Sequence, residues 1–116
     1  MKDLVSFDLF NKLDLRVGRI EKVEMITGID RLYKLTVNFG LELGQRVVLS
    51  GIRNYSIEEL MGRKAVFVYN LEPKKVKGVV SEGMLLAACV GETEEGHGVP
   101  VFVIPERDVP EGTLVH

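Results

Sequence analysis

Apolar and polar residues alternate with a period of two along much of the chain, which predicts a protein built mainly of β-strands. The clearest alternation covers residues 33–39, and its apolar face is expected in the core. That face consists of Tyr33, Leu35, Val37 and Phe39. A similar pattern over residues 13–25 changes phase near Gly18, which indicates a bent strand of the kind that small barrels need. Shorter apolar runs predict strands over residues 45–50, 64–70, 83–89, 99–104 and 113–115.

Residues 7–13 predict a short amphipathic helix ahead of the first strand. Ser6 can cap its N-terminus, and Phe7, Phe10 and Leu13 recur at three-residue spacing on one face. A helix this short is not stable alone. Its apolar face is therefore expected to pack on the barrel or on a second copy of the chain.

A second helix is predicted between the third and fourth strands, where Ser56 and Glu59 form a capping box and Gly62 ends the helix. Three strands, a helix and two strands follow the order of an OB-fold, an all-β, five-stranded barrel in which the helix plugs one end. An SH3-like barrel is the alternative that this pattern leaves open. OB-folds bind oligonucleotides on strands two and three and on two loops. In this chain those loops are residues 27–31 and 71–82.

The length of 116 residues and an apolar content of 46% fit one folded domain over residues 1–116. The longest apolar runs are too short to span a membrane. Asp3 and Asp8 fall where a secretory signal would be basic and then apolar, and the lone Cys89 excludes an internal disulfide. These features predict a cytoplasmic protein.

Charge is distributed unevenly along the chain, although the net charge is only −2. Residues 31–88 carry nine basic and five acidic side chains, whereas residues 89–116 carry one basic and six acidic side chains. The loop at residues 71–82 contains Lys74, Lys75 and Lys77, which cannot be buried without partners. A basic loop at the ligand-binding position of an OB-fold predicts binding to a polyanion.

Metal and nucleophile chemistry are not expected. Cys89, His97 and His116 are the only cysteine and histidines, and their spacing matches no metal site. Cys89 is interpreted as a small buried residue of a strand.

Phosphate-loop and carboxylate-pair chemistry are not expected either. Residues 78–83 have the glycine spacing of a phosphate loop, but Met84 and Leu85 stand where lysine and a hydroxyl residue are required. The acidic cluster of Glu92, Glu94 and Glu95 is interpreted as part of a solvated loop. We therefore expect neither enzymatic activity nor a cofactor.

Four stretches of the chain resemble the tRNA-binding domain family: LDLRVGRIEKVE (residues 13–24), DRLYKLTV (30–37), LSGIRNY (49–55) and EELMGRKAVFVYNLEPKKVKGVVSEGMLLAA (58–88). The most specific pattern is Asn-Leu-x-Pro-x-Lys-x-x-Gly-x-x-Ser-x-Gly-Met, which runs from Asn70 to Met84. Two positions depart from the family. Arg31 replaces a lysine and keeps its charge, and Lys77 replaces an arginine and loses the bidentate fork.

The resemblance implies an OB-fold that binds tRNA largely by shape, at its outer corner and without catalysis. Carried over residue by residue, it implies tRNA contacts from Lys34, Arg53, Asn70, Lys75, Lys77, Ser81 and Met84. Lys74 is expected to be a bystander. Asn70 keeps the alternative of closing a turn, and Met84 that of a core residue.

Stand-alone members of this family form homodimers, so the resemblance also implies a dimer interface. Its expected residues are Phe7, Phe10, Val101, Phe102, Val103 and Ile104. The expected function is that of a stand-alone tRNA-binding protein or of the accessory beta subunit of methionyl-tRNA synthetase. Its expected partners are tRNA, a second copy of the chain and an aminoacyl-tRNA synthetase. A protein-export chaperone dimer and an interaction module that tethers a synthetase remain open as alternatives.

Overall fold

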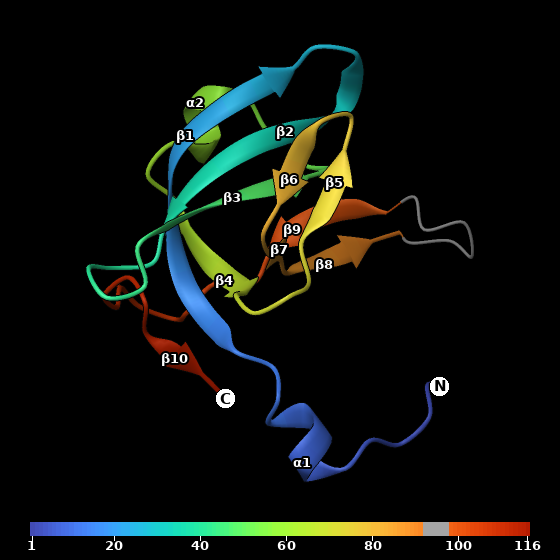
Figure 1. The fold of residues 1–116 in the computed structure, drawn as a ribbon, viewed down its shortest axis with the longest axis vertical. Coiled ribbons are helices and arrows are strands. Elements are labelled where there is room, and N and C mark those ends of the chain that lie inside the picture. The colour runs from blue at the N-terminus through green and yellow to red at the C-terminus, as the bar shows by residue number, and fades with distance from the viewer. Residues whose placement is uncertain (92–97) are drawn as a thin grey trace.

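The barrel is formed by one curved antiparallel sheet in a computed structural model that describes residues 1–91 and 98–116 (Figure 1). The sheet has the strand order β3-β2-β1-β4-β7, and β10 pairs with the start of β1. Its strands are β1 (Leu15–Ile26), β2 (Ile29–Asn38), β3 (Gln45–Ser50), β4 (Lys64–Val68), β7 (Met84–Leu85) and β10 (Leu114–Val115). The order of the strands matches the prediction, as do the bounds of β3 and the start of β4, and the predicted OB-fold is confirmed.

Single hydrogen bonds rather than a ladder join the two ends of this sheet. The backbone N–H of Glu82 donates to Val47 O at 2.8 Å, and the Glu82 carboxylate accepts from Val47 N at 3.2 Å. Leu49 N donates to Ser81 Oγ at 3.0 Å. The segment before β7 is thereby fixed to β3, which brings the fourth-to-fifth strand connection over the face of β2 and β3.

The core confirms the face predicted for β2, since Tyr33, Leu35, Val37 and Phe39 are all buried. The ring of Phe39 meets that of Phe67 edge to face at 5.5 Å between centroids. β1 bends where its register with β2 shifts after Ile20. A Cβ on Gly18 would lie 2.5 Å from Val37 Cγ1, so glycine is needed there for β1 to cross the core closely.

Helix α2 (Ile57–Leu60) lies between β3 and β4, as predicted. The Ser56 hydroxyl accepts from Glu59 N at 3.1 Å, and the Glu59 carboxylate accepts from Ser56 N at 2.9 Å. This capping box is confirmed, and the hydrogen bonds from Ser56 lower the pKa of Glu59. Leu60 is fully buried and anchors the helix in the barrel.

Helix α1 (Phe7–Phe10) is shorter than predicted, although Ser6 caps it as expected, its Oγ accepting from Leu9 N at 3.0 Å. The helix and the residues before it extend away from the barrel, and all of residues 1–13 are exposed (Figure 1). Without tertiary packing, a stripe of this length supports only about one turn.

The predicted loop at residues 71–82 contains a β-hairpin, which corrects that prediction. Its strands are β5 (Lys74–Val76) and β6 (Val79–Ser81), joined by a two-residue turn. Lys77 and Gly78 both have positive φ, at 47° and 85°, as a type I′ turn requires. The alternation of apolar and polar residues on either side of this turn is too short to predict the hairpin from the sequence.

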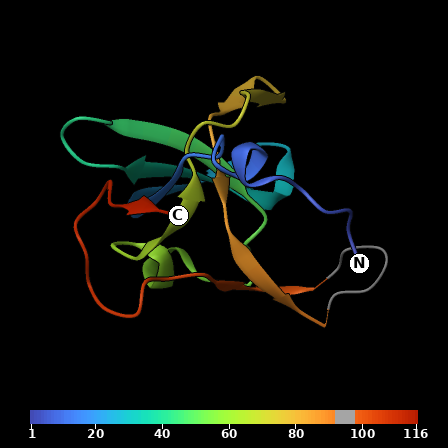
Figure 2. The ribbon, with the colours of Figure 1, turned by 90° about the horizontal axis from the view of Figure 1, so that it is seen from below.

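The predicted fifth strand is divided into β7 and β8 (Ala87–Val90), and β8 pairs with β9 (Val99–Phe102) instead of continuing along the barrel. Figure 2 shows this second hairpin reaching away from the barrel. The prediction of a buried Cys89 is therefore wrong, because the cysteine lies on β8 and is exposed. The acidic cluster interpreted as part of a solvated loop, Glu92, Glu94 and Glu95, lies outside the described residues, as does His97.

Ion pairs hold the C-terminal segment against the barrel. Lys64 Nζ lies 2.8 Å from Asp108 Oδ1 and 3.5 Å from Glu111 Oε1, and Arg19 Nε lies 3.1 Å from the same Glu111 oxygen. The hydrogen bond that Lys64 Nζ donates to the Asp108 carboxylate raises the pKa of Lys64. The backbone N–H of Glu111 itself, with Lys64 and Arg19, lowers the pKa of the Glu111 carboxyl.

Within the described ranges, no helix is long and apolar enough to cross a membrane.

Candidate nucleic-acid interface

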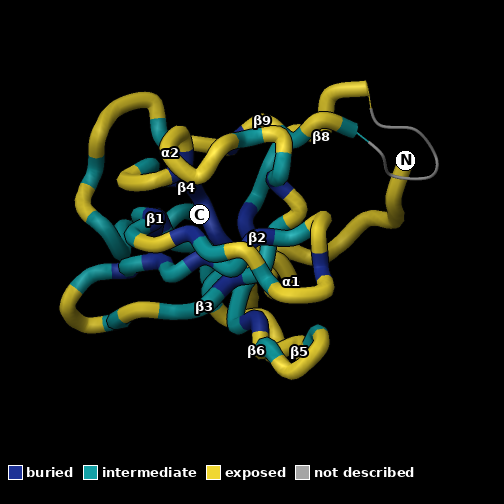
Figure 3. The backbone as a smooth tube through the Cα atoms, turned by 90° about the horizontal axis from the view of Figure 1, so that it is seen from above, coloured by how far each residue is buried: buried dark blue, intermediate teal, exposed yellow. Residues whose placement is uncertain are grey.

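The basic side chains of the fourth-to-fifth strand connection are displayed by the β5–β6 hairpin. Lys74 and Lys75 are neighbours on β5, so their side chains leave opposite faces of the hairpin, and both are exposed. Lys77 occupies the turn, and its ammonium donates to Gly28 O at 3.3 Å. The hairpin tip therefore contacts the turn between β1 and β2. Figure 3 shows the hairpin projecting beyond the barrel with mostly exposed residues.

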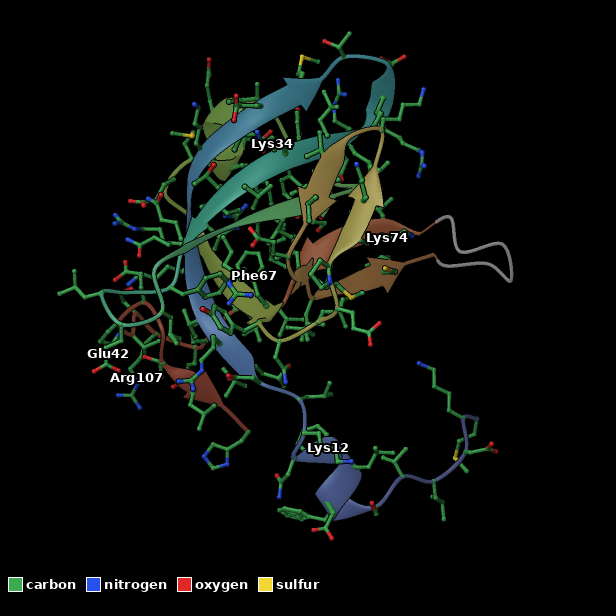
Figure 4. The ribbon with its side chains drawn as sticks, viewed as in Figure 1. Lys12, Lys34, Glu42, Phe67, Lys74 and Arg107 are labelled. Carbon is green, nitrogen blue, oxygen red and sulfur yellow. The ribbon has the colours of Figure 1, made fainter. Side chains whose placement is uncertain are left out.

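Lys34 lies on β2 with its side chain on the outer surface of the barrel (Figure 4). Glu24 on β1 is its direct neighbour across the sheet, and a carboxylate at that position partly offsets the ammonium charge. Lys34 is half-buried. A phosphate could therefore meet Lys34 on the sheet itself, at β2 and not on the hairpin.

Arg53 is held against the protein rather than extended into solvent. Its guanidinium carbon lies 4.8 Å from the centre of the Tyr33 ring, and its Nη1 donates to Asp30 O. Its Nε is buried with no hydrogen-bond partner among the described residues. This arrangement ties the start of β2 to the segment after β3, so Arg53 supports the shape of the interface in addition to any contact it makes.

Asn70 fastens the start of the first strand to the end of β4. Its Oδ1 accepts from Asp14 N at 2.8 Å, and its Nδ2 donates to Lys12 O at 2.7 Å. Both functions of the amide are engaged within the protein. Asn70 therefore has a structural role, although these bonds join it to residues 12 and 14 and do not close its own turn.

Ser81 is buried and has two partners within the barrel. Its Oγ accepts from Leu49 N and donates to Gly83 O at 3.2 Å. A tRNA contact through this hydroxyl stays a prediction, and in the structure the group faces β3. Met84, by contrast, is 47% exposed on β7, which corrects the alternative of a core residue.

The side chains expected at a dimer interface divide into two groups. Phe7, Phe10, Val101, Val103 and Ile104 are exposed, as an interface requires of the free chain. Phe102 is the exception and corrects the expectation, because it is only 9% exposed and belongs to the core. Its ring lies 4.8 Å from that of Tyr55, and the guanidinium of Arg63 covers it at 4.8 Å.

A cavity of about 250 Å³ lies between the hairpin and the face of β2 and β3. Arg31, Glu72 and Lys74 contribute charged groups to its lining, and Leu71 and Met84 are among the apolar ones. The sequence patterns did not bring these residues together. The only signal that could have done so is the Lys-Gly turn, which would have placed Lys74 on the inner face of a hairpin.

Among residues 1–91 and 98–116 no three histidine, cysteine or carboxylate side chains gather as metal ligands would. The part of the chain that is described thus presents a basic hairpin and a small cavity, with no metal site beside them.

A family model described as "Putative tRNA binding domain" matches residues 15–114. The methionine–tRNA ligase of Deinococcus radiodurans is 45% identical over 113 residues, which are 97% of this chain and 16% of the ligase. The chain spans about 16% of the length of the curated relatives it matches.

Two solved structures are similar over almost their whole length. The methionyl-tRNA synthetase-related protein of Pyrococcus horikoshii is 40% identical with a TM-score of 0.83, covering 99% of this chain and 100% of that one. The chaperone CsaA of Bacillus anthracis is 32% identical with a TM-score of 0.85, covering 98% and 100%. The family match extends over nearly all of the barrel and its hairpins, and the chain belongs to the tRNA-binding domain family.

Proposed function

We propose that this chain binds tRNA without catalysis and that the β5–β6 hairpin is the main contact. The observation that carries the proposal is the position of the hairpin. Three exposed lysines stand on the connection that OB-folds use for nucleic acids, in a chain of the tRNA-binding domain family.

The proposed mechanism is electrostatic. Lys75 and Lys77 approach tRNA phosphates, and the release of condensed counterions drives association. Because the hairpin tip is attached to the β1–β2 turn through Lys77 and Gly28, the charges are presented by a supported structure. Asn70 and Ser81 act by holding the two ends of this connection, through their bonds to Asp14 and Leu49. Binding is expected to follow the shape of the A-form RNA backbone.

The test is filter binding of bulk tRNA over a range of salt concentrations, comparing the protein with a Lys75→Ala, Lys77→Asn double variant. Asparagine is chosen at position 77 because the residue has positive φ, which asparagine tolerates. The double variant should bind more weakly, and its slope of log affinity against log salt should fall by roughly 0.7–0.9 for each lost phosphate contact.

Arg107→Ala is the matched control. Arg107 is 84% exposed and lies across the molecule from Lys74 (Figure 4), so its removal changes the net charge without touching the hairpin. It should leave the slope unchanged. An unaltered affinity and slope in the hairpin variant would refute the proposal. An equal loss of affinity in the hairpin variant and in Arg107→Ala would show a general effect of charge and not a contact by the hairpin.

We further propose that the chain acts as a homodimer, either standing alone or as an accessory subunit of an aminoacyl-tRNA synthetase. Exposed apolar residues on two projecting elements support this proposal. They lie on α1 and its flanks and on β9 with the residues after it: Leu4, Phe7, Phe10, Val101, Val103 and Ile104. Surfaces of this kind on a small protein mark a contact with another chain.

A chaperone role is the alternative, since similar structures include chaperones. Identity is higher to the synthetase-related protein, at 40% against 32%. Protection of a denatured client protein from aggregation, without any retardation of tRNA in a gel, would favour the chaperone instead.

A further inference from the structure

The cavity between the β5–β6 hairpin and the barrel has a construction of its own. Its apolar walls include Leu32, Leu71, Val76 and Met84, and its volume is about 250 Å³. An engineered apolar cavity of about 150 Å³ takes benzene, whereas pockets for drug-sized ligands start at about 300 Å³. The cavity is therefore matched to a flat ring system of one or two rings.

The walls of this cavity are held in place before any ligand arrives. Ser81 and Glu82 bond the base of the hairpin to Leu49 and Val47 of β3. Lys77 bonds its tip to Gly28. The cavity lies between these two attachments, so a ligand meets a preformed site and orders little of the protein on binding.

The charged groups at the cavity are not those of a site that binds only a phosphate. Arg31 and Lys74 are exposed at its rim and attract anions, but Glu72 lines the same cavity. No ion pair within residues 1–91 and 98–116 joins Glu72 to either cation. A carboxylate there opposes a phosphate, and it accepts hydrogen bonds from amino and imino groups. The exposed side chains of Arg31, Lys74 and Glu72 line the apolar cavity together. An apolar cavity lined by two cations and one carboxylate is complementary to one nucleotide.

We propose that this cavity takes a single unpaired nucleotide of the bound RNA, with guanine as the preferred base. This inference rests on the proposed tRNA-binding function. The base lies against Leu71 and the polarisable thioether of Met84, which favours contact with aromatic rings. Its phosphates meet Arg31 and Lys74. Glu72 accepts from the N1–H and the N2 amino group of guanine, two donors side by side that no other RNA base presents.

Unpaired bases are the part of RNA whose edges a protein can read. The three lysines on the hairpin supply affinity for any backbone, and Glu72 adds a preference for a base. The division of roles also accounts for Lys74, which shares the inner face of β5 with Val76 while Lys75 faces outward.

The test uses the whole chain and two fluorescent single-stranded RNA hexamers, one of uridine only and one with a single central guanosine. The unaltered protein should prefer the guanosine hexamer by about tenfold, the discrimination of one good bidentate contact. In Glu72→Gln this preference should fall to about twofold, while affinity for the uridine hexamer holds or rises because a negative charge is removed. Glu72 is exposed, so the substitution leaves the fold intact.

Glu42→Gln is the matched control, since Glu42 is exposed and lies on the opposite side of the molecule from Lys74 (Figure 4). It should keep the tenfold preference. Leu71→Ala is a second variant, which should weaken binding of the guanosine hexamer severalfold more than that of bulk tRNA.

Three outcomes would overturn the proposal. One is an equal preference in Glu72→Gln and the unaltered protein. Another is normal binding of bulk tRNA with no binding of either hexamer, which would leave the proposed function standing. The third is that an unfolded polypeptide binds at the cavity and neither hexamer displaces it. Loss of all RNA binding in the unaltered protein would instead refute the proposed function itself.

Discussion

Ser81→Ala is the substitution that best separates a structural role from contact with RNA. Ser81 is only 9% exposed. Removing its hydroxyl leaves the N–H of Leu49 and the C=O of Gly83 without the hydrogen-bond partner that they share. Each buried unpaired group costs about 1–3 kcal/mol. Leu49 and Gly83 are only half-buried, so water satisfies part of this loss. We expect the free energy of unfolding to fall by about 2 kcal/mol, which lowers Tm by about 8 °C for a domain of this size.

The assay is urea unfolding followed by circular dichroism, at one fixed protein concentration because association would otherwise contribute to stability. Affinity for tRNA, measured well below the unfolding transition, should change by no more than about threefold, since the hydroxyl faces β3. Ser6→Ala is the control. It removes the cap of an exposed four-residue helix and should alter the stability of the barrel by less than about 0.5 kcal/mol.

The opposite pattern would refute this reasoning. If Ser81→Ala kept its full stability and lost more than about tenfold in tRNA affinity, the hydroxyl would be an RNA ligand and the bond to Leu49 dispensable. The resemblance to the family alone implies that result, so the experiment decides between the two roles of the residue.

Two further predictions concern stability at low pH and association. The lowered pKa of Glu111 contributes stability above the pKa of an unfolded glutamate, about 4.3, and that stability is lost as pH falls through the lowered value. The free energy of unfolding measured from pH 6 to pH 3 should therefore fall less in Glu111→Gln than in the unaltered protein. An identical pH profile would contradict the lowered pKa of Glu111. Sedimentation velocity at micromolar concentration should give a species near twice the 13.0 kDa of one chain, and Phe10→Ser with Ile104→Ser should shift it to the monomer. A monomer of the unaltered protein would exclude the dimer.

Much of the fold could be predicted because its signals are local. The alternation through Tyr33 and Phe39 indicated both the strand and its buried face, and the capping box at Ser56 located α2. Gly18 marked the bend of β1, since a residue without Cβ is needed where the strand crosses Val37. The split between β7 and β8 was not predictable, because a continuous apolar run does not show which sheet each half joins.

The candidate site was predicted only in part. The order of the predicted strands and helix placed the three lysines on the connection between the fourth and fifth strands. The directions of Asn70 and Ser81 did not, because their partners Asp14 and Leu49 lie 56 and 32 positions away along the chain. A pattern that describes neighbours in sequence carries no information about such bonds.

The sequence by itself determined the barrel, the family and the placing of positive charge on the fourth-to-fifth strand connection, since periodicity, caps and motifs act over a few residues. Only the tertiary structure decided what that connection is. Its C-terminal end bonds to β3 and its tip to the β1–β2 turn, and its hairpin borders a cavity with Glu72 in its lining. Those contacts join segments brought together by the curvature of the sheet, and the cavity exists only once the sheet has curved.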